Sequence, residues 1–216
     1  MSLVVKLIIT AVAGYLLGSA NTSLIVGKFY GVDVRKHGSG NAGMTNTLRT
    51  LGKLAALFVI IGDLLKGILA CLVGLYIVGD RGIEAEVFGR TWNEELGLMV
   101  GGISAIIGHN WPAYFRFKGG KGILTSLAVV LMMDPLIALI LFGIFAVIVA
   151  ITRYVSLGSI IGSGLFPVAA AVFGRSNAFI IFAAILGLLA IIRHRANIQR
   201  IYNGTESKLG SKKKNN

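Results

Sequence analysis

Long apolar runs, separated by short polar stretches, are the feature that most constrains what this chain can fold into. The longest runs exceed the roughly 20 residues that a helix needs to cross a bilayer. Hydrophobic residues make up 55% of the chain and charged residues only 14%, whereas soluble domains contain about 25% charged residues. We therefore predict an all-α, polytopic integral membrane helical bundle that forms a single domain over residues 1–206. The expected spans are 3–26, 54–78, 96–107, 123–133, 136–151, 154–173 and 178–192.

The distribution of lysine and arginine favours seven spans, with the N-terminus outside and the C-terminus in the cytoplasm. Residues 123–151 could form one kinked helix or two short helices that meet at Asp134-Pro135. A single helix would send the basic tail Lys212–Lys214 outside, against the positive-inside rule. Two helices place sixteen of the 21 basic residues inside and leave Lys66 within the membrane. Only four then lie outside, namely Lys6, Arg81, Arg90 and Arg175.

Several other stretches carry less information about function. The net charge is +12, but the cations flank apolar runs and form no separate basic domain, so nucleic acid is not an expected partner. Residues 207–216 are predicted to be a disordered basic tail attracted to anionic lipid. The acidic loop over residues 80–95 receives no role. Cys71 is the only cysteine, so it cannot form an intrachain disulfide and is expected to be inert.

The polar segment Gly38–Thr50, with the sequence GSGNAGMTNTLRT, is a candidate anion site between the first two long runs. Its glycines let backbone amides approach a ligand, and its hydroxyl and amide side chains add hydrogen-bond donors. Arg49 adds a permanent planar cation suited to phosphate. A flexible solvated loop is the alternative, but polar groups at a membrane face are costly unless they are used.

A second polar segment, His109–Gly122, ends in Lys118-Gly119-Gly120-Lys121-Gly122 directly before an apolar run. Glycine amides at a helix N-terminus, with lysine beside them, can cradle a phosphate. The run is not a Walker A loop, because glycine rather than serine or threonine follows Lys121. A simple glycine cluster at a helix start remains the alternative.

Two more polar segments lie in the C-terminal half. Arg153–Ser159 offers a cation and two hydroxyls at the start of a span, which a membrane anchor and a helix cap would also explain. His194 and Asn197 share a face if the last helix continues past Ile192, although a histidine at a membrane boundary is more often hydrogen-bonded than a base. Three histidines, one cysteine and few cytoplasmic carboxylates predict no metal site, and no cofactor is expected.

Asp63 and Lys66 lie inside the second expected span. They are three residues apart, so they share a helix face and can pair. Ionisable groups within the membrane are functional candidates, but mutual neutralisation is the simpler explanation of this pair.

The predicted topology brings all four polar segments to the cytoplasmic side, which predicts one shared site. A carrier for a phosphorylated solute is the leading alternative function. Such a carrier should have polar residues that reach both membrane faces, and often an internal repeat. The polar segments here lie on one face, and the sequence contains no convincing repeat, so we favour an enzyme.

Five motifs, in order and spacing, resemble the bacterial acyl-phosphate:glycerol-3-phosphate acyltransferases, the PlsY-type integral-membrane acyltransferases. The motifs cover nearly the whole chain. One departure is Gly18-Ser19-Ala20-Asn21-Thr22, where the family often has a proline soon after Gly-Ser. The HxxxxD pair of acyl-CoA-dependent glycerolipid acyltransferases is absent, because no histidine has an aspartate five residues later. The motifs are GSGNAGMTNTLR (38–49), GDLLKG (62–67), GHNWPAYFRFKGGKG (108–122), TRYVSLGS (152–159) and RHRANIQRIYNGTE (193–206).

The resemblance implies transfer of a fatty acyl group from acyl phosphate to the 1-hydroxyl of glycerol 3-phosphate, the first step of bacterial phospholipid synthesis. The products would be 1-acyl-glycerol 3-phosphate (lysophosphatidic acid) and phosphate. It implies a multi-pass protein of the bacterial cytoplasmic (inner) membrane, embedded in the lipid bilayer, with a cytoplasmic active site and a functional link to an enzyme that forms acyl phosphate. The implied catalytic residues are Ser39, Asn46, Arg49, Lys121, Ser159, His194 and Asn197. The implied substrate-binding residues are Gly38, Gly40, Asn41, Gly43, Thr45, His109, Asn110, Lys118, Gly119, Gly120, Gly122 and Arg153.

Overall fold

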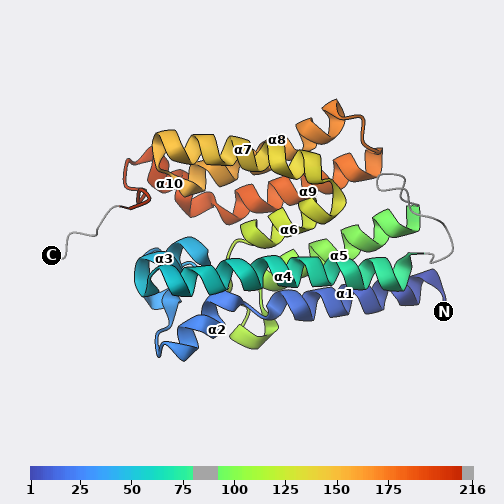
Figure 1. The fold of residues 1–216 in the computed structure, drawn as a ribbon, viewed down its shortest axis with the longest axis horizontal. Coiled ribbons are helices and arrows are strands. Elements are labelled where there is room, and N and C mark those ends of the chain that lie inside the picture. The colour runs from blue at the N-terminus through green and yellow to red at the C-terminus, as the bar shows by residue number, and fades with distance from the viewer. Residues whose placement is uncertain (80–91, 211–216) are drawn as a thin grey trace. The chain divides into compact units, whose positions relative to one another are not determined.

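The structure, a computed structural model, describes residues 1–79 and 92–210. Within these residues it contains ten α-helices, two short 3₁₀ helices and no strands, which confirms the all-α prediction. The chain divides into two compact units, Met1–Asp134 and Pro135–Asn216, whose helices are labelled in Figure 1. The single domain over residues 1–206 stays a prediction.

The first unit is built on three long helices, α1 (Leu3–Ser19), α4 (Lys53–Val78) and α5 (Trp92–Asn110), which lie side by side in Figure 1. Small residues let their backbones approach closely, as in other membrane bundles. Side chains at Gly18 and Gly74 would collide with the backbones of Ala105 and Gly97. The shorter elements of this unit are α2 (Thr22–Phe29), η1 (Val34–Lys36), α3 (Met44–Leu51), η2 (Ala113–Phe115) and α6 (Ile123–Met133).

The second unit contains α7 (Pro135–Thr152), α8 (Val155–Val172), α9 (Asn177–Arg193) and α10 (Arg195–Tyr202). Phe166 of α8 meets Phe179 of α9 edge to face, with ring centroids 5.8 Å apart. Glycines again allow close packing, because a side chain at Gly187 would press on the backbone of Ser163.

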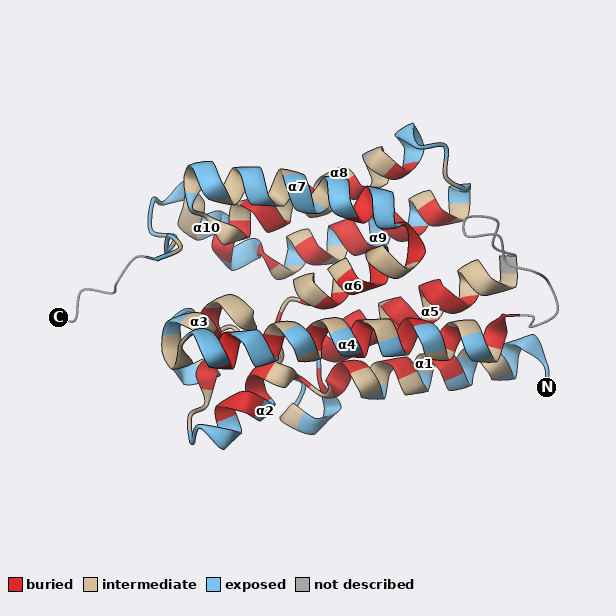
Figure 2. Cartoon of the chain, in the orientation of Figure 1, coloured by how far each residue is buried: buried red, intermediate tan, exposed pale blue. Residues whose placement is uncertain are grey.

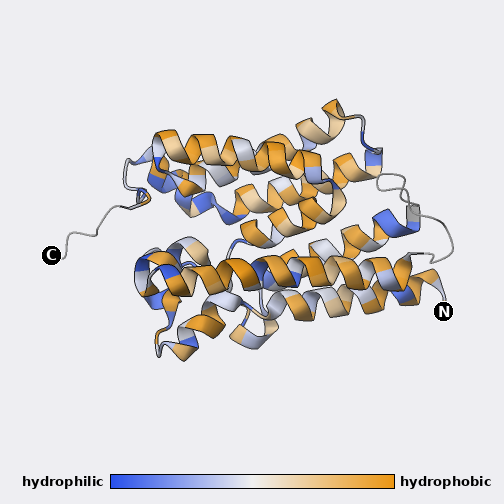
Figure 3. Cartoon of the chain, in the orientation of Figure 1, coloured by the Kyte–Doolittle hydropathy of each residue, from blue (hydrophilic) through white to orange (hydrophobic). Residues whose placement is uncertain are grey.

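Large apolar side chains cover much of the helix exteriors, as the pale blue exposed positions of Figure 2 and the orange positions of Figure 3 show. Ile151 and Val172 are 78% and 77% exposed, which is typical of lipid-facing positions rather than of a soluble surface. Among the described residues, four helices are long and apolar enough to cross a membrane: Leu3–Phe29, which joins α1 and α2, then α4, α7 and α8. A fifth is added if α9 and α10, bent by 57°, form one span.

All seven predicted spans are helical, with boundaries shifted by a few residues. The count of seven and the outside N-terminus stay predictions. The break predicted at Asp134-Pro135 is confirmed, because α6 ends at Met133 and α7 begins at Pro135. Helix α5 begins at Trp92 rather than at 96, with Glu94 and Glu95 in its first turn, where carboxylates interact favourably with the helix dipole. Residues 80–91 of the predicted acidic loop lie outside the described residues.

The first predicted span is broken at Ala20-Asn21, although this chain lacks the family's proline there. The Asn21 side chain caps α2 by accepting a hydrogen bond from Leu24 N at 3.1 Å, a role for which asparagine is well suited. Its amide also donates to the carbonyl of Ala42 at 3.4 Å. The break therefore fixes part of the Gly38–Thr50 segment.

Candidate active site

The Gly38–Thr50 segment begins as a loop and ends as α3. Asn46, in the first turn of α3, is 1% exposed. Its Oδ1 accepts a hydrogen bond from Ser39 N (2.8 Å), and its Nδ2 donates to the carbonyls of Val34 (2.8 Å) and His37 (3.1 Å). Gly38 has a φ of +59°, and a side chain there would collide with Asn46 Oδ1. The alternative of an unstructured linker does not fit a segment with so many internal hydrogen bonds.

Two predicted catalytic residues lie on the surface of this segment, in contrast to Asn46. Ser39 and Arg49 are exposed, whereas the buried Thr47 bonds to Ser23 Oγ at 2.7 Å. Asn46 thus shapes the loop, whereas Ser39 and Arg49 lie at its surface. Their catalytic roles stay predictions.

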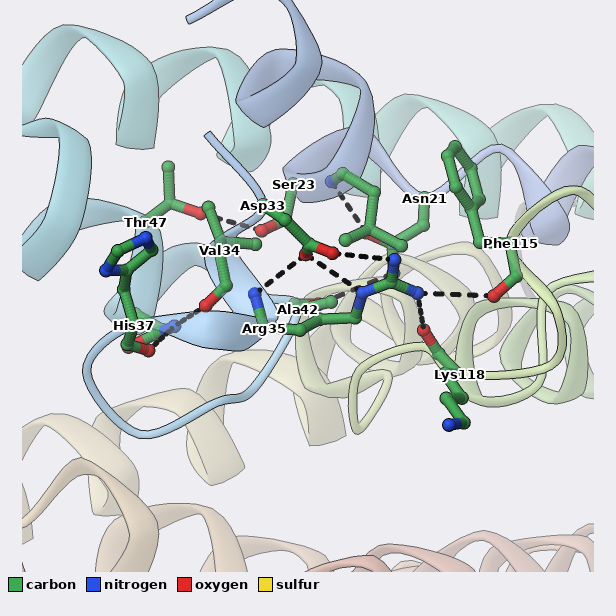
Figure 4. Close-up of polar contacts among 12 residues, drawn as sticks. Asn21, Ser23, Asp33, Val34, Arg35, His37, Ala42, Thr47, Phe115 and Lys118 are labelled. Carbon is green, nitrogen blue, oxygen red and sulfur yellow. Dashed lines mark hydrogen bonds and ion pairs between the residues drawn. The ribbon is translucent and has the colours of Figure 1, made fainter. Parts of the chain in front are cut away.

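Arg35 joins this segment to the second polar loop, as Figure 4 shows. Its Nε and Nη2 each lie 3.0 Å from the Asp33 carboxylate, and its Nη1 donates to the carbonyls of Phe115 and Lys118, both at 3.2 Å. The hydrogen bond from Arg35 holds the pKa of Asp33 below its ordinary value. Arg35 is therefore a clamp between two loops, a role that its sequence position did not reveal.

The glycines of the second loop allow it to pack against its neighbours without side chains between them. Gly120 N donates to the carbonyl of His109 at 3.1 Å. A side chain at Gly120 would collide with the carbonyl of Ala42 and with His109 Nε2, and one at Gly119 would collide with the backbone of His109. Gly122, with a φ of +77°, is the residue from which α6 starts. The glycine loop (Gly119–Gly122) thus contacts the Gly38–Thr50 segment and also begins a helix, and its phosphate binding stays a prediction.

Other predicted site residues of this unit, the catalytic candidate Lys121 among them, differ in exposure. Lys118 is exposed and Lys121 is half-buried, whereas Asn110 is buried. Arg116 and Phe117, directly before the loop, both have left-handed backbones, with φ of 56° and 58°. Such conformations are strained for residues other than glycine, so the surrounding hydrogen bonds must hold this turn.

A buried ionic cluster lies beneath the glycine loop. Lys66 Nζ of α4 is 2.8 Å from Asp63 Oδ1 and 2.8 Å from His109 Nδ1. The three residues are 5%, 1% and 3% exposed. The predicted Asp63–Lys66 pair is thus formed and has His109, at the end of α5, as a third member. A contact between two helices leaves no trace in sequence spacing, so the third member could not be predicted.

The second unit contains a different polar cluster around Glu206. Its Oε1 accepts hydrogen bonds from Ser156 Oγ and Asn197 Nδ2, and its Oε2 accepts one from Arg200 Nε, all at 2.7 Å. Burial raises the pKa of Glu206, but these three hydrogen bonds outweigh it and hold the pKa below its ordinary value. Glu206 was not among the predicted site residues, although it is the only acid in the basic stretch 193–208.

Arg153 has two of its guanidinium nitrogens on one backbone carbonyl. Its Nε and Nη2 donate to Leu209 O at 3.0 and 2.7 Å, and Leu209 N donates back to Arg153 O at 2.7 Å. Part of the predicted disordered tail, up to Gly210, is thus described and held by Arg153, while residues 211–216 lie outside the described residues. Arg153 acts here as an anchor for the chain end, and its predicted role in substrate binding stays a prediction.

Helix α9 ends at Arg193, one residue past the predicted span, and His194 lies at the bend before α10. His194 Nδ1 lies 2.7 Å from the carbonyl of Ala190. A carbonyl only accepts, so Nδ1 carries the proton and Nε2 has the lone pair in the neutral ring. Ser159 Oγ donates to Val155 O at 2.9 Å, within its own helix. Asn197, on α10, donates its side-chain amide hydrogen bond to Glu206 Oε1.

The predicted site residues therefore form two groups. The first unit holds those of the Gly38–Thr50 segment and the glycine loop, which are in contact through Ala42 and Gly120. The second unit holds Arg153, Ser159, His194 and Asn197. The single site formed by all four segments stays a prediction.

Known proteins match the chain over almost its full length. The family model for glycerol-3-phosphate acyltransferase matches residues 8–204. Glycerol-3-phosphate acyltransferases from Thermoanaerobacter sp. (strain X514) and Clostridioides difficile (strain 630) are 45% and 46% identical, covering 95% of this chain and 96% and 97% of theirs.

A solved structure gives the same result. The glycerol 3-phosphate form of PlsY, an integral membrane glycerol 3-phosphate acyltransferase, superimposes with a TM-score of 0.82 at 35% identity, covering 94% of this chain and 96% of that one. The lysophosphatidic acid form of the same enzyme superimposes with a TM-score of 0.80. With its apolar helices, this makes the chain a multi-pass membrane protein and an acyltransferase. The chain belongs to the glycerol-3-phosphate acyltransferase family, as the resemblance in its five motifs indicated.

Proposed function

We propose that this protein transfers a fatty acyl group from acyl phosphate to the 1-hydroxyl of glycerol 3-phosphate. The products are 1-acyl-glycerol 3-phosphate and inorganic phosphate, and the reaction begins bacterial phospholipid synthesis. The family supports glycerol 3-phosphate as the acceptor, because the matched relatives are named for it. The absence of an HxxxxD pair supports a donor other than acyl-CoA.

The observation that carries this proposal is the contact between the glycine loop and the Gly38–Thr50 segment. Gly120 lies against both Ala42 and His109 so closely that no side chain fits between them. Two polar segments with the cations Arg49 and Lys121 therefore lie at one place in the first unit. Both substrates carry phosphate, and a site for two anions needs several cations and backbone amides.

The chemistry requires no covalent enzyme intermediate. The hydroxyl oxygen of glycerol 3-phosphate attacks the acyl carbonyl carbon, a new ester C–O bond forms, and the bond from that carbon to the phosphate oxygen breaks. The electron pair leaves with the phosphate, which is a good leaving group. Arg49 and Lys121 would stabilise the tetrahedral oxyanion and the departing phosphate.

The hydroxyl proton needs an acceptor. A substrate phosphate can take it. Ser39 as a nucleophile would need a base beside it, and the hydrogen bond from its backbone N to Asn46 Oδ1 supplies none. We therefore place Ser39 among the groups that bind substrate and favour direct transfer.

The charge distribution supports a cytoplasmic site. The predicted topology places sixteen basic residues, including Arg49 and Lys121, on the inner side of the bacterial cytoplasmic membrane. Acyl phosphate is an activated donor, so a functional link to an enzyme that makes it belongs to the proposal.

Phosphate release from purified protein tests the reaction. Palmitoyl phosphate with glycerol 3-phosphate should release phosphate, and omission of either substrate should abolish release. Palmitoyl-CoA, run in parallel, should be inert as a donor. Lys121→Ala should lower turnover by about 100-fold, as expected for loss of one charge-stabilising group.

Lys28→Ala, which removes an exposed lysine of α2, is the matched control and should retain wild-type turnover. Transfer from palmitoyl-CoA would overturn the donor assignment. Saturable glycerol 3-phosphate binding without turnover from either donor would overturn the proposed reaction in favour of a carrier.

A further inference from the structure

The motif GDLLKG (62–67) has no part in the chemistry proposed above, although its two ionisable residues are buried in α4. Lys66 reaches three acceptors: Asp63 Oδ1 at 2.8 Å, His109 Nδ1 at 2.8 Å and the carbonyl of Ala20 at 3.4 Å. The contact to Asp63 is an ion pair, and the contacts to His109 and Ala20 are hydrogen bonds. The Lys66 side chain therefore connects α4 to the end of α5 and to the break between α1 and α2.

The contact to His109 fixes the orientation of its ring. A charged lysine has no lone pair, so His109 Nδ1 accepts the hydrogen bond and the ring proton lies on Nε2. Nε2 lies on the side of Gly120, since a side chain at Gly120 would collide with it, and the carbonyl of His109 accepts the hydrogen bond from Gly120 N. The ring and the backbone of His109 therefore both support the glycine loop.

The glycines of the motif bring neighbouring elements close to the same ion pair. A side chain at Gly62 would collide with Thr22 of α2, and one at Gly67 would press on Thr125 and Ala128 of α6. Helix α6 starts directly after the glycine loop. The motif thus contacts His109, which supports the glycine loop, and it also contacts α6, the helix that follows the loop.

Neutralisation alone does not account for these contacts. Asp63 and Lys66 would neutralise each other without His109 or Ala20. Apolar residues of similar size would also avoid the cost of burying charge in a membrane, and such replacements of buried ion pairs are often neutral or stabilising. The contacts of the pair to His109 and Ala20 therefore indicate a role beyond neutralisation.

We propose that Asp63 and Lys66 are positioning residues, which hold the glycine loop through His109 in the geometry that binds the phosphate of glycerol 3-phosphate. The identity of the ligand rests on the proposed function. Neither residue touches the substrate in this proposal. Both act through His109 and the glycine loop, and therefore on acceptor binding and not on the acyl donor.

The test uses the uncharged double variant Asp63→Asn/Lys66→Met, which removes both charges together and leaves no unpaired ion. Cys71→Ala, a buried position in the same helix, is the matched control. Calorimetric binding of glycerol 3-phosphate, the KM for palmitoyl phosphate and thermal unfolding in detergent are measured for each protein. Nitrogen-15 spectra of labelled histidine, assigned with His109→Gln, report the tautomer.

We expect the double variant to unfold near the wild-type temperature and to lose the single Nε2–H tautomer of His109. Its Kd for glycerol 3-phosphate should rise about tenfold, as expected when one charged hydrogen bond is lost, while the KM for palmitoyl phosphate stays within about twofold. Cys71→Ala should match the wild type in all four measurements.

A double variant with wild-type Kd and tautomer would overturn the proposal and leave neutralisation as the explanation. Equal losses in both substrates with a lowered unfolding temperature would overturn it in favour of a purely structural pair. Failure of the proposed function is recognised separately, because wild-type protein would then release no phosphate whatever the tautomer of His109.

Discussion

Two carboxylates, the buried Asp63 in one unit and the half-buried Glu206 in the other, are held in different ways. Asp63 lies in the middle of an apolar helix, and its partners, Lys66 and His109, are themselves ionisable and buried. Glu206 follows the last helix, and two of its three partners are neutral, while the third, Arg200, has a side chain 37% exposed. Removal of Lys66 therefore leaves the buried Asp63 carboxylate without its cation, whereas the partners of Glu206 can be lost one at a time.

The largest expected effect follows from breaking the first cluster on one side. Lys66→Met leaves the Asp63 carboxylate without its cation and should lower the free energy of unfolding by about 3–5 kcal/mol. Thermal unfolding of the two proteins in the same detergent measures the loss. If Lys66→Met unfolded within a degree or two of the wild type, the ion pair would not stabilise this unit as described.

A smaller loss is expected from the second cluster. Glu206→Gln keeps the shape of the side chain but removes the charge that accepts hydrogen bonds from Ser156, Asn197 and Arg200, and should cost about 1–3 kcal/mol. Arg200→Met should cost less, about 1 kcal/mol or below, because its side chain is partly exposed and the other two donors remain. A larger loss for Arg200→Met than for Glu206→Gln would contradict this account of the cluster.

The wild type and Glu206→Gln should also differ in how their stability responds to acid. The pKa of Glu206 is held below its ordinary value of 4.5, so its stabilising effect is complete above that pH and is lost as the pH falls through the lowered pKa. The gap in unfolding temperature between the wild type and Glu206→Gln should be constant between pH 7 and about pH 5 and then narrow. A gap that widened with acid would mean that the carboxyl is protonated more readily in the folded protein.

The smallest effect on stability is expected for Ser159→Ala. Its hydroxyl bonds only to the carbonyl four residues earlier in α8, an interaction that adds little to a helix, so the loss should be about 0.5 kcal/mol or less. The effect of Ser159→Ala on turnover can then be measured apart from any effect on stability. A variant with normal unfolding but reduced phosphate release would support the predicted contact of Ser159 with substrate, and normal values of both would remove Ser159 from the site.

The sequence predicted the helical architecture well, because apolar runs of helical length report directly on spanning segments. The break at Asp134-Pro135 was predicted from the distribution of basic residues, because a single helix through this point would send Lys212–Lys214 outside. The break at Asn21 was harder, since asparagine caps a helix only when its neighbours allow it, and no proline marked the place. The start of α5 at Trp92 was missed because Glu94 and Glu95 resemble a loop by composition.

The site was predictable where one segment contains its own chemistry, as in the glycine loop and Gly38–Thr50. It was less predictable where a side chain acts across elements. Arg35 was an unremarked basic residue until its guanidinium was found on the carbonyls of Phe115 and Lys118. His109 and Glu206 obtain their roles from partners far away in sequence, at separations of 43 and 50 residues for Lys66 and Ser156.

The most direct test of the account is the KM for glycerol 3-phosphate in Gly120→Ala, compared with Gly143→Ala. The methyl group at position 120 would collide with Ala42 and His109, whereas at position 143 of α7 it meets open space. We predict that Gly120→Ala raises this KM at least about tenfold while the KM for palmitoyl phosphate stays within about twofold, because the backbone of the glycine loop is proposed to bind the phosphate of glycerol 3-phosphate. Gly143→Ala should leave both values unchanged. An unchanged KM for glycerol 3-phosphate in Gly120→Ala, or an equal rise for both substrates, would contradict the assignment of the glycine loop to the acceptor.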